Sequence, residues 1–365
     1  PQMTAGVLTA MDAGINRALE GLRVCEDIFR FSVRNSVSAE FKDIRHAIVQ
    51  AASFIPASQL IRARDVASDS QKFIDTGAET FRSGMGHVFR SNIRRAAESV
   101  RSLEEFSKTF NADAGASFQN IRFRLYGLEQ KGWSLLVKDD LLSRFRFSLY
   151  SVLDVSFVKA ESMPSAASTL IAAGARIIQL RMKNTPDSIF LPLAREISSI
   201  CSGSSALFVV NDRPDIAVLS GAAGLHLGQD DMTPDEARRI TGEDMLIGIS
   251  AHSYEEAVKC IETSADYIAV GPVFPSVSKK GEFFDGLGTS LLREICAVTE
   301  KPVVAMGGIT RDTVSSVMEA GCSSAVAISS LYTGQNLSAN AAEFVKAIAA
   351  FEIKKTSSGN DEEGV

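Results

Sequence analysis

The pattern of apolar and polar positions changes near residue 145. Before that point the sequence predicts helices almost throughout and contains no convincing alternating strand. After it, short apolar runs alternate with helical stretches such as Ala166–Ala173, Asp235–Ile240 and Thr313–Ala320. The apolar runs predict eight strands, at Phe147–Leu153, Ile177–Leu180, Leu207–Val210, Leu225–Leu227, Leu246–Ile249, Tyr267–Val270, Val303–Met306 and Ala325–Ile328.

Strands that alternate with helices in this way predict an α/β fold, a (β/α)8 TIM barrel, preceded by an all-α helical domain. A doubly wound open sheet is the alternative, but no GxGxxG motif follows the first predicted strand. In a barrel of this type the active site lies at the carboxyl-terminal ends of the strands, so the residues at those ends are the first candidates for a site.

The charge changes at nearly the same place, from about +2 in residues 1–140 to about −8 in residues 141–365, in a chain whose net charge is −6. We therefore predict domains at 1–140 and 141–353, followed by a polar, disordered tail at 354–365. The five cysteines are scattered and form no CxxC motif, which indicates a reduced, cytoplasmic protein without a zinc site. The chain has no long apolar run, no secretory signal and an acidic balance, so we expect neither a membrane nor a nucleic acid as partner.

An internal repeat runs through the helical domain. Ile15–Glu26 aligns with Ile93–Glu104, and Ile15, Arg17, Ala18, Glu20, Arg23 and Glu26 match Ile93, Arg95, Ala96, Glu98, Arg101 and Glu104. Glutamate and arginine three residues apart share a helix face, so one interpretation is a pair of bundle helices with solvated ion pairs. The other is an anion pocket in which Arg17, Arg23, Arg95 and Arg101 converge. The sequence leaves both open.

Polar residues follow the predicted strands. The ends carry cations, carboxylates and small residues: Arg181, Lys183, Lys279, Asp212, Asp231, Gly307, Gly308 and Ser329. Mg²⁺ takes one or two protein carboxylates and completes its shell with water and phosphate oxygens, and the last two strand ends of such barrels commonly bind a phosphate. The mouth is therefore predicted to hold a metal-bound polyphosphate and a monophosphate. Taken singly, Asn211-Asp212 could be a turn, and His226 and His252 could be core residues.

Seven segments in this order closely resemble the thiamine phosphate synthase (thiamine phosphate pyrophosphorylase) family. They are QLRMK (179–183), NDRPD (211–215), GLHLGQDD (224–231), IGISAH (247–252), DYIAVGPVFPSVSK (266–279), PVVAMGGI (302–309) and AVAISS (325–330). The resemblance covers about residues 146–335. It implies a Mg²⁺-dependent transferase that joins a pyrimidine methyl diphosphate to a thiazole phosphate by dissociative displacement, giving thiamine phosphate and pyrophosphate.

The resemblance also implies the site residues. The pyrimidine diphosphate site would contain Gln179, Arg181, Lys183, Asn211, Ser250 and Lys279, among which Arg181, Lys183, Ser250 and Lys279 would act in catalysis. The thiazole phosphate site would contain Ser276, Ser278, Gly308, Ile328 and Ser329. Asp212 and Asp231 would bind Mg²⁺. The family usually has threonine at positions 276 and 278, where serine keeps the hydroxyl and loses a methyl group.

The helical domain carries the segments NRALEGLRVCED (16–27), RH (45–46), RARD (62–65), RRAAESVRSLEE (94–105) and RFRLY (122–126). With these it resembles a domain that is fused in front of this synthase in some bacteria and has been linked to phosphorylation of the pyrimidine precursor. The chain has no Walker A motif, so a docking or oligomerisation role, which would suit a homo-oligomer, stays open beside a kinase or carrier role. For the barrel, the alternatives are a thiazole tautomerase of the same family and a non-catalytic thiamine phosphate sensor. Retention of the cations and carboxylates of the diphosphate site favours the synthase.

Overall fold

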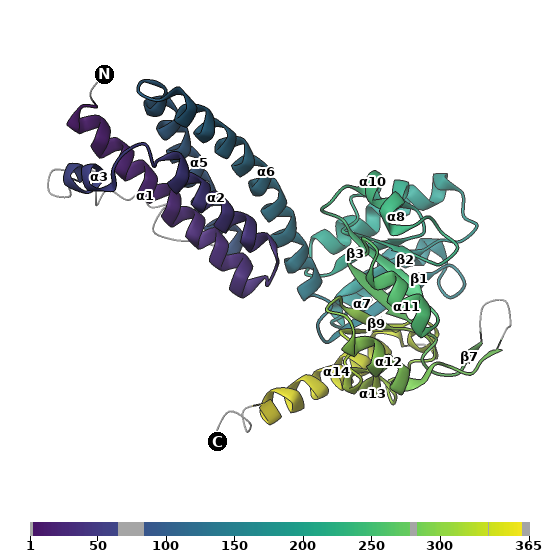
Figure 1. Ribbon diagram of the computed structural model, residues 1–365. Coiled ribbons are helices and arrows are strands. Elements are labelled where there is room, and N and C mark those ends of the chain that lie inside the picture. Colours follow the sequence, from purple (N-terminus) through teal and green to yellow (C-terminus); the bar gives the residue numbers. More distant parts are fainter. Residues whose placement is uncertain (1–2, 65–83, 278–282, 335, 360–365) are drawn as a thin grey trace. The chain divides into compact units, whose positions relative to one another are not determined.

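The computed structural model describes residues 3–64, 84–277, 283–334 and 336–359 (Figure 1). The chain divides into two compact units, Pro1–Asp139 and Asp140–Val365, close to the boundary that the charge pattern predicts. The candidate residues Ser278 and Lys279 lie outside the described residues.

The first unit is helical, as the sequence predicts. Its helices are α1 (Ala5–Asp27), α2 (Val37–Ala51), α3 (Ala57–Ala63), α5 (Met85–Lys108) and α6 (Ala112–Ser143), and a π-helical turn, Ile28–Ser32, follows α1. The two copies of the repeat lie on α1 and α5. A Cβ atom added to Gly21 would lie 2.8 Å from the Asn92 carbonyl oxygen, and one added to Gly14 would lie 3.1 Å from Leu103. The two helices therefore pack closely and run antiparallel.

Each copy of the repeat ends in a buried glutamate that pairs with an arginine of the following helix. Arg45 Nη1 on α2 donates to Glu26 Oε2 at 2.6 Å, and Arg122 Nε on α6 donates to Glu104 Oε2 at 2.8 Å. Glu26 is 4% exposed and Glu104 is fully buried. The repeat thus extends beyond the aligned segment to two helical hairpins, α1–α2 and α5–α6, each joined by the same kind of ion pair.

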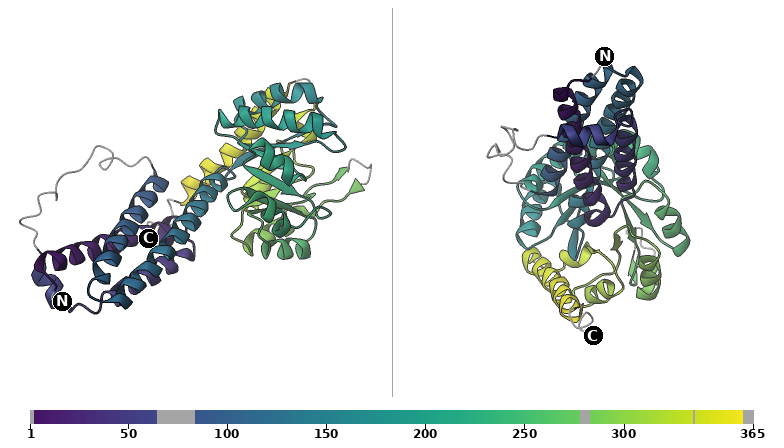
Figure 2. Two further views of the ribbon diagram at one scale, coloured as in Figure 1. Left: turned by 90° about the horizontal axis from the view of Figure 1, so that it is seen from above. Right: turned by 60° about the vertical axis from the view of Figure 1, so that its left-hand side comes forward.

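The second unit is a closed barrel of eight parallel strands in the order β1-β10-β9-β6-β5-β4-β3-β2, which confirms the predicted fold class. The strands are β1 (Ser148–Asp154), β2 (Ile177–Arg181), β3 (Leu207–Asn211), β4 (Gly224–Leu227), β5 (Leu246–Ala251), β6 (Tyr267–Val270), β9 (Val303–Ala305) and β10 (Ser324–Ala327). Each of the eight predicted strands overlaps one of these within three residues at either end. Helices cover the outside of the barrel (Figure 2).

The outer helices are α7 (Met163–Ala172), α8 (Asp187–Ser202), α9 (Pro214–Ser220), α10 (Pro234–Thr241), α11 (Tyr254–Ile261), α12 (Gly288–Ala297), α13 (Val314–Glu319) and α14 (Leu337–Gly359). Residues 354–359 continue α14, where the sequence analysis expects the start of a polar, disordered tail. The segment contains no proline, and its only glycine is the final residue of the helix, so no residue type that breaks helices interrupts it. Across the described ranges, no helix is both long and apolar enough to cross a membrane.

Aromatic side chains fill one end of the barrel interior. Phe145 precedes β1, and its ring centroid lies 6.1 Å from that of Tyr150 and 4.7 Å from that of Tyr267. A Cβ atom added to Gly248 of β5 would lie only 2.0 Å from the Tyr267 ring, so the glycine provides the space that the ring occupies. Because Phe145 closes the amino-terminal end, the carboxyl-terminal end is left for a site.

The sequence did not predict one feature near that end, a two-stranded antiparallel ribbon of β7 (Ser276–Val277) and β8 (Phe283–Phe284) between β6 and α12. Two-residue strands are too short to produce a recognisable alternation of apolar and polar positions.

Candidate active site

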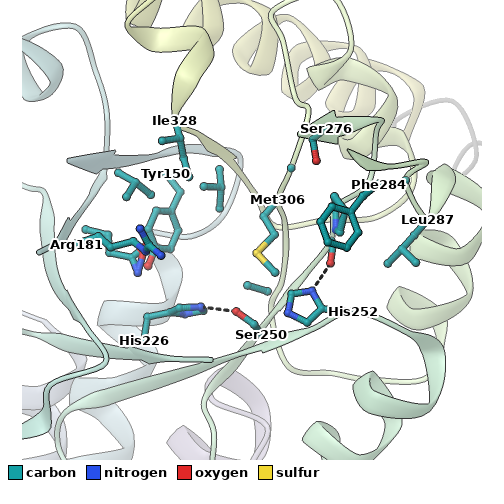
Figure 3. A pocket seen from close by; sticks show the side chains of 18 of the residues that line it. Tyr150, Arg181, His226, Ser250, His252, Ser276, Phe284, Leu287, Met306 and Ile328 are labelled. Atoms are coloured by element: carbon teal, nitrogen blue, oxygen red, sulfur yellow. Dashed lines mark hydrogen bonds between the residues drawn. The ribbon is translucent and has the colours of Figure 1, made fainter. Parts of the chain in front are cut away.

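A cavity of about 790 Å³ opens at the carboxyl-terminal ends of the strands. Six of the sequence-predicted site residues line it: Gln179, Arg181, Asn211, Ser250, Ser276 and Ile328. Its walls are largely apolar and include Tyr150, Met306 and Ile328, and Tyr150 lies beside the polar side chain of Arg181 (Figure 3). Ligand pockets commonly combine such apolar walls with a few polar groups that fix the ligand's orientation.

The polar side chains of β2 and β3 are held by side-chain hydrogen bonds. Gln179 Nε2 donates to Asn211 Oδ1 at 3.0 Å, and both residues are buried. Arg181 Nη1 donates to Asp154 Oδ2 at 2.7 Å. The sequence analysis missed Asp154, the fully buried last residue of β1. Its position at the end of the first strand is the signal that points to it, because polar residues at the ends of the other strands make up the predicted site.

Two carboxylates converge beside these residues. Asp231 accepts a hydrogen bond from the Gly228 N–H at 2.7 Å, and Lys183 forms an ion pair with Asp212. Burial, and after it the neighbouring carboxyl of Asp212, raise the pKa of Asp231 above its ordinary value. Two neighbouring carboxylates form a donor set suited to a divalent cation with oxygen ligands, such as Mg²⁺. The adjacent Asp230 is exposed, which favours Asp231 as the ligand of the two.

A chain of hydrogen-bonding side chains crosses the barrel, and three of its four residues, Tyr150, His226 and Ser250, also line the cavity. His226 Nε2 lies 3.0 Å from Ser250 Oγ, and His226 Nδ1 lies 3.1 Å from the Tyr267 hydroxyl oxygen. The Tyr267 hydroxyl in turn lies 3.0 Å from that of Tyr150. Burial lowers the pKa of His226 to about 4, so the ring is neutral at physiological pH.

The opposite side of the mouth is built from backbone turns. Gly307 and Gly308 follow β9 with φ angles of +87° and +67°, and a Cβ atom on Gly308 would lie 2.8 Å from the Phe274 carbonyl oxygen. Only glycine fits such a conformation and such a close approach without strain. Ser329 is exposed directly after β10. Exposed backbone N–H groups and a hydroxyl in this region are suited to an anion.

Further residues that the sequence analysis did not select also line the cavity. Phe284 and Leu287 approach it from β8 and the segment that follows (Figure 3). His252 Nδ1 donates to the Gly271 carbonyl oxygen at 2.6 Å, which fixes the orientation of its ring. Five predicted residues lie near the mouth but not in the cavity wall: Lys183, Asp212, Asp231, Gly308 and Ser329.

The arginines of the helical repeat are exposed. Arg23 pairs with Asp27 on its own helix at 3.2 Å, and Arg101 pairs with Glu104 and Glu105 at 2.8 and 3.0 Å. The antiparallel packing that an arginine pocket would need is present, but Arg23 and Arg101 are engaged by carboxylates of their own helices. The structure therefore favours ion pairs within each helix over an anion pocket at these two positions, although one of the partners, Glu104, is buried.

Comparison with known proteins gives consistent results. Residues 149–331 match the family described as Thiamine monophosphate synthase, and residues 9–131 match the ThiD2 family. The thiamine-phosphate synthase of Prochlorococcus marinus is 32% identical over 325 residues, which cover 88% of this chain and 90% of that protein. The Synechocystis sp. thiamine-phosphate synthase is 35% identical over 317 residues, 85% of this chain and 87% of that protein. The solved thiamine phosphate pyrophosphorylase from Pyrococcus furiosus superposes with a TM-score of 0.51 and 30% identity, covering 57% of this chain and 98% of that one.

The closed parallel barrel, with a cavity at the carboxyl-terminal ends of its strands, defines a (β/α)8-barrel enzyme. The matches extend over most of this chain and most of each curated relative. The chain belongs to the thiamine-phosphate synthase family, whose members are transferases of thiamine biosynthesis.

Proposed function

We propose that the barrel condenses a pyrimidine methyl diphosphate with a thiazole phosphate to give thiamine phosphate and pyrophosphate. The C–O bond between the pyrimidine methylene and the diphosphate breaks, and its electron pair leaves on pyrophosphate. The aminopyrimidine ring supplies electrons to the methylene carbon, so the step can be dissociative. The lone pair of the thiazole nitrogen then forms the new C–N bond, and no protein nucleophile is needed.

The observation that carries this proposal is the convergence of Asp212 and Asp231 beside Lys183 and Arg181. Bound Mg²⁺, held by the two aspartates, would supply positive charge to the diphosphate. Lys183 and Arg181 supply fixed positive charge from the protein, and the buried partner Asp154 orients the Arg181 guanidinium. Charge that is held in place before the reaction stabilises a leaving anion without reorganisation.

The remaining cavity residues suit the two organic rings. Gln179 and Asn211 are hydrogen-bonded to each other and provide further amide groups that can bind a polar aminopyrimidine. The apolar walls at Tyr150, Met306 and Ile328 exclude water from a cation-like methylene carbon, which water would otherwise trap. The glycine turn after β9, with Ser276, Ser278 and Ser329, would bind the thiazole phosphate.

The test is an assay of the full-length chain with both phosphorylated precursors and Mg²⁺. Thiamine phosphate and pyrophosphate should form together in equal amounts, and chelation of the metal should stop both. A reaction lacking the thiazole phosphate is the control. Isomerisation of a thiazole phosphate without consumption of the diphosphate would support the tautomerase instead. Binding of thiamine phosphate without turnover would support the sensor.

Ser276→Ala is expected to weaken binding of the thiazole phosphate selectively. A hydroxyl that donates to a charged group contributes about 1.5–3 kcal/mol, so the KM for the thiazole phosphate should rise about tenfold or more. The KM for the pyrimidine diphosphate should change little. Ser290→Ala, at an exposed position of α12, is the matched control. A raised KM for the diphosphate with an unchanged KM for the thiazole phosphate would reverse the assignment of the two subsites.

A further inference from the structure

Four buried residues form one line of hydrogen bonds from the barrel interior to the cavity. Tyr150, Tyr267, His226 and Ser250 are each 8% exposed or less, and successive polar atoms lie 3.0, 3.1 and 3.0 Å apart. His226 and Ser250 are drawn with their contact in Figure 3. Gly248 leaves the space that lets the Tyr267 ring lie inside the barrel. The line is therefore built into the strands rather than into a loop.

The direction of these hydrogen bonds decides what Ser250 can do. A serine hydroxyl has a single hydrogen, and a diphosphate oxygen can only accept. If His226 carries its proton on Nδ1, the bare Nε2 accepts the Ser250 hydrogen, and none is left for an anion. If His226 carries its proton on Nε2, that N–H donates to Ser250 Oγ, and the Ser250 hydrogen is free to point into the cavity.

The tyrosine end of the line favours the second direction. With the proton on Nδ1 of His226, Tyr267 must donate to Tyr150, and the Tyr150 hydrogen then needs an acceptor. Within the described part of the chain, the Tyr150 hydroxyl has no hydrogen-bond partner other than Tyr267. In the opposite direction Tyr150 donates to Tyr267, Tyr267 donates to Nδ1 and His226 donates to Ser250, so the one hydrogen left over is that of Ser250. A bound diphosphate supplies its acceptor, whereas the Tyr150 hydrogen faces no anion in the first direction. A buried donor without an acceptor costs free energy, so the second direction is preferred when the diphosphate is bound.

We propose that Tyr267 is a positioning residue that holds His226 in the Nε2–H form, so that the Ser250 hydroxyl donates to the diphosphate. Tyr150, behind it, fixes the direction of the Tyr267 hydroxyl. This inference rests on the proposed function, because it takes Ser250 as a residue that contacts the diphosphate. It adds two residues, Tyr267 and Tyr150, on which that contact depends.

A double-mutant cycle on the full-length chain tests the inference. Ser250→Ala should lower kcat/KM for the pyrimidine diphosphate by roughly 10- to 100-fold, the range for a hydrogen bond to a charged group. Tyr267→Phe alone should lower it by about 5- to 10-fold, since Ser250 then loses its orientation but not its hydroxyl. In the Ser250→Ala background, Tyr267→Phe should add less than about a twofold loss, because coupled residues are not additive.

The matched control is Tyr332→Phe, which removes a hydroxyl that donates to the Val152 carbonyl oxygen at 3.1 Å in the same barrel. Its effect should be small and should be the same with Ser250 and with alanine at that position. If Tyr267→Phe were additive with Ser250→Ala, as expected for a merely structural role, the inference would be overturned while the proposed site stands. An unimpaired Ser250→Ala enzyme would remove Ser250 from the diphosphate site and overturn both.

A second measurement, by NMR, determines which ring nitrogen of His226 carries the proton and does not depend on activity. The chain has four histidines, so ¹⁵N-labelled histidine gives few ring signals, and a His226→Asn variant assigns those of His226. With Mg²⁺ and pyrophosphate as the probe, His226 should carry its proton on Nε2, and Tyr267→Phe should move part of the population to Nδ1. A His226 ring protonated on Nδ1 in the wild-type chain with pyrophosphate bound would overturn the inference.

Discussion

Asp212→Asn and Asp231→Asn are each expected to lower the rate of thiamine phosphate formation by about 10²–10³-fold, the usual cost of losing one preorganised stabiliser of a developing anion. Both carboxylates lie at the polar mouth, and the neighbouring Asp212 carboxyl raises the pKa of Asp231, an effect that a bound divalent cation would offset. Each variant should also need more Mg²⁺ for half-maximal rate. Initial rates measured over a range of Mg²⁺ concentrations give both quantities.

Asp230→Asn is the matched control, because Asp230 is the exposed neighbour of Asp231 and carries the same charge. Its rate and Mg²⁺ requirement should stay close to those of the wild-type chain. A larger loss at Asp230 than at Asp231 would show that the other carboxylate of the pair binds the metal. Equal and small losses in all three variants would remove the metal from this part of the mouth.

Glu104→Gln is expected to destabilise the helical unit at neutral pH. Arg122 Nε, Lys108 Nζ and Arg101 Nη1 donate to the fully buried Glu104 carboxylate at 2.8, 2.7 and 2.8 Å. Burial alone would raise the pKa of Glu104, but these hydrogen bonds outweigh it and lower the pKa to about 2. Breaking a buried ion pair costs about 3–5 kcal/mol of stability. Because Lys108 and Arg101 are half exposed and screened by solvent, we expect Glu104→Gln to lower the free energy of unfolding by about 2–3 kcal/mol. Denaturant unfolding followed by circular dichroism measures this free energy.

The lowered pKa of Glu104 also predicts how the difference in stability between wild type and Glu104→Gln changes with pH. Because the pKa of Glu104 is lower in the folded chain than in the unfolded one, its stabilisation is complete above the unfolded value of about 4.5. It is lost as the pH falls toward 2, so the difference in stability between wild type and Glu104→Gln should narrow over that interval. Glu105→Gln is the control, since Glu105 pairs with the same Arg101 and Lys108 from an exposed position. Equal losses in both variants would contradict a special role for burial.

The sequence by itself determined the two kinds of unit and the eight barrel strands. Strands such as Leu207–Asn211, buried along their whole length, read as continuous apolar runs. The helices between the strands show the apolar periodicity of an amphipathic helix instead, so strands and helices can be told apart from neighbouring residues alone. The rule that barrel sites lie at strand ends then singled out Arg181, and the family resemblance added Gln179, Asn211 and Ser250. All four line the cavity. Their assignment to the diphosphate subsite stays a prediction.

Short or conditional features could not be read in this way. Each strand of the β7–β8 ribbon is only two residues long, which is too short to show an alternating pattern. The end of α14 lies in a polar segment without apolar periodicity, so the sequence pattern does not mark the last helical residue. The repeat predicted that Arg23 and Arg101 occupy equivalent places but not which groups they would meet. A guanidinium on a helix surface can bind a ligand or a neighbouring carboxylate, and in both copies carboxylates of the same helix lie within reach.

Only the tertiary structure decided which buried polar groups belong to one another. Tyr150 and Tyr267 are 117 residues apart in the sequence and look like ordinary apolar strand positions, yet their hydroxyls meet inside the barrel. The pairing depends on the register of strands that close on themselves, and on Gly248, whose missing side chain makes room for the Tyr267 ring. Asp154 likewise gains its role from Arg181 on the neighbouring strand. Hydrogen bonds act over about 3 Å and in fixed directions, so they are set by the closure of the barrel and not by the pattern along the chain.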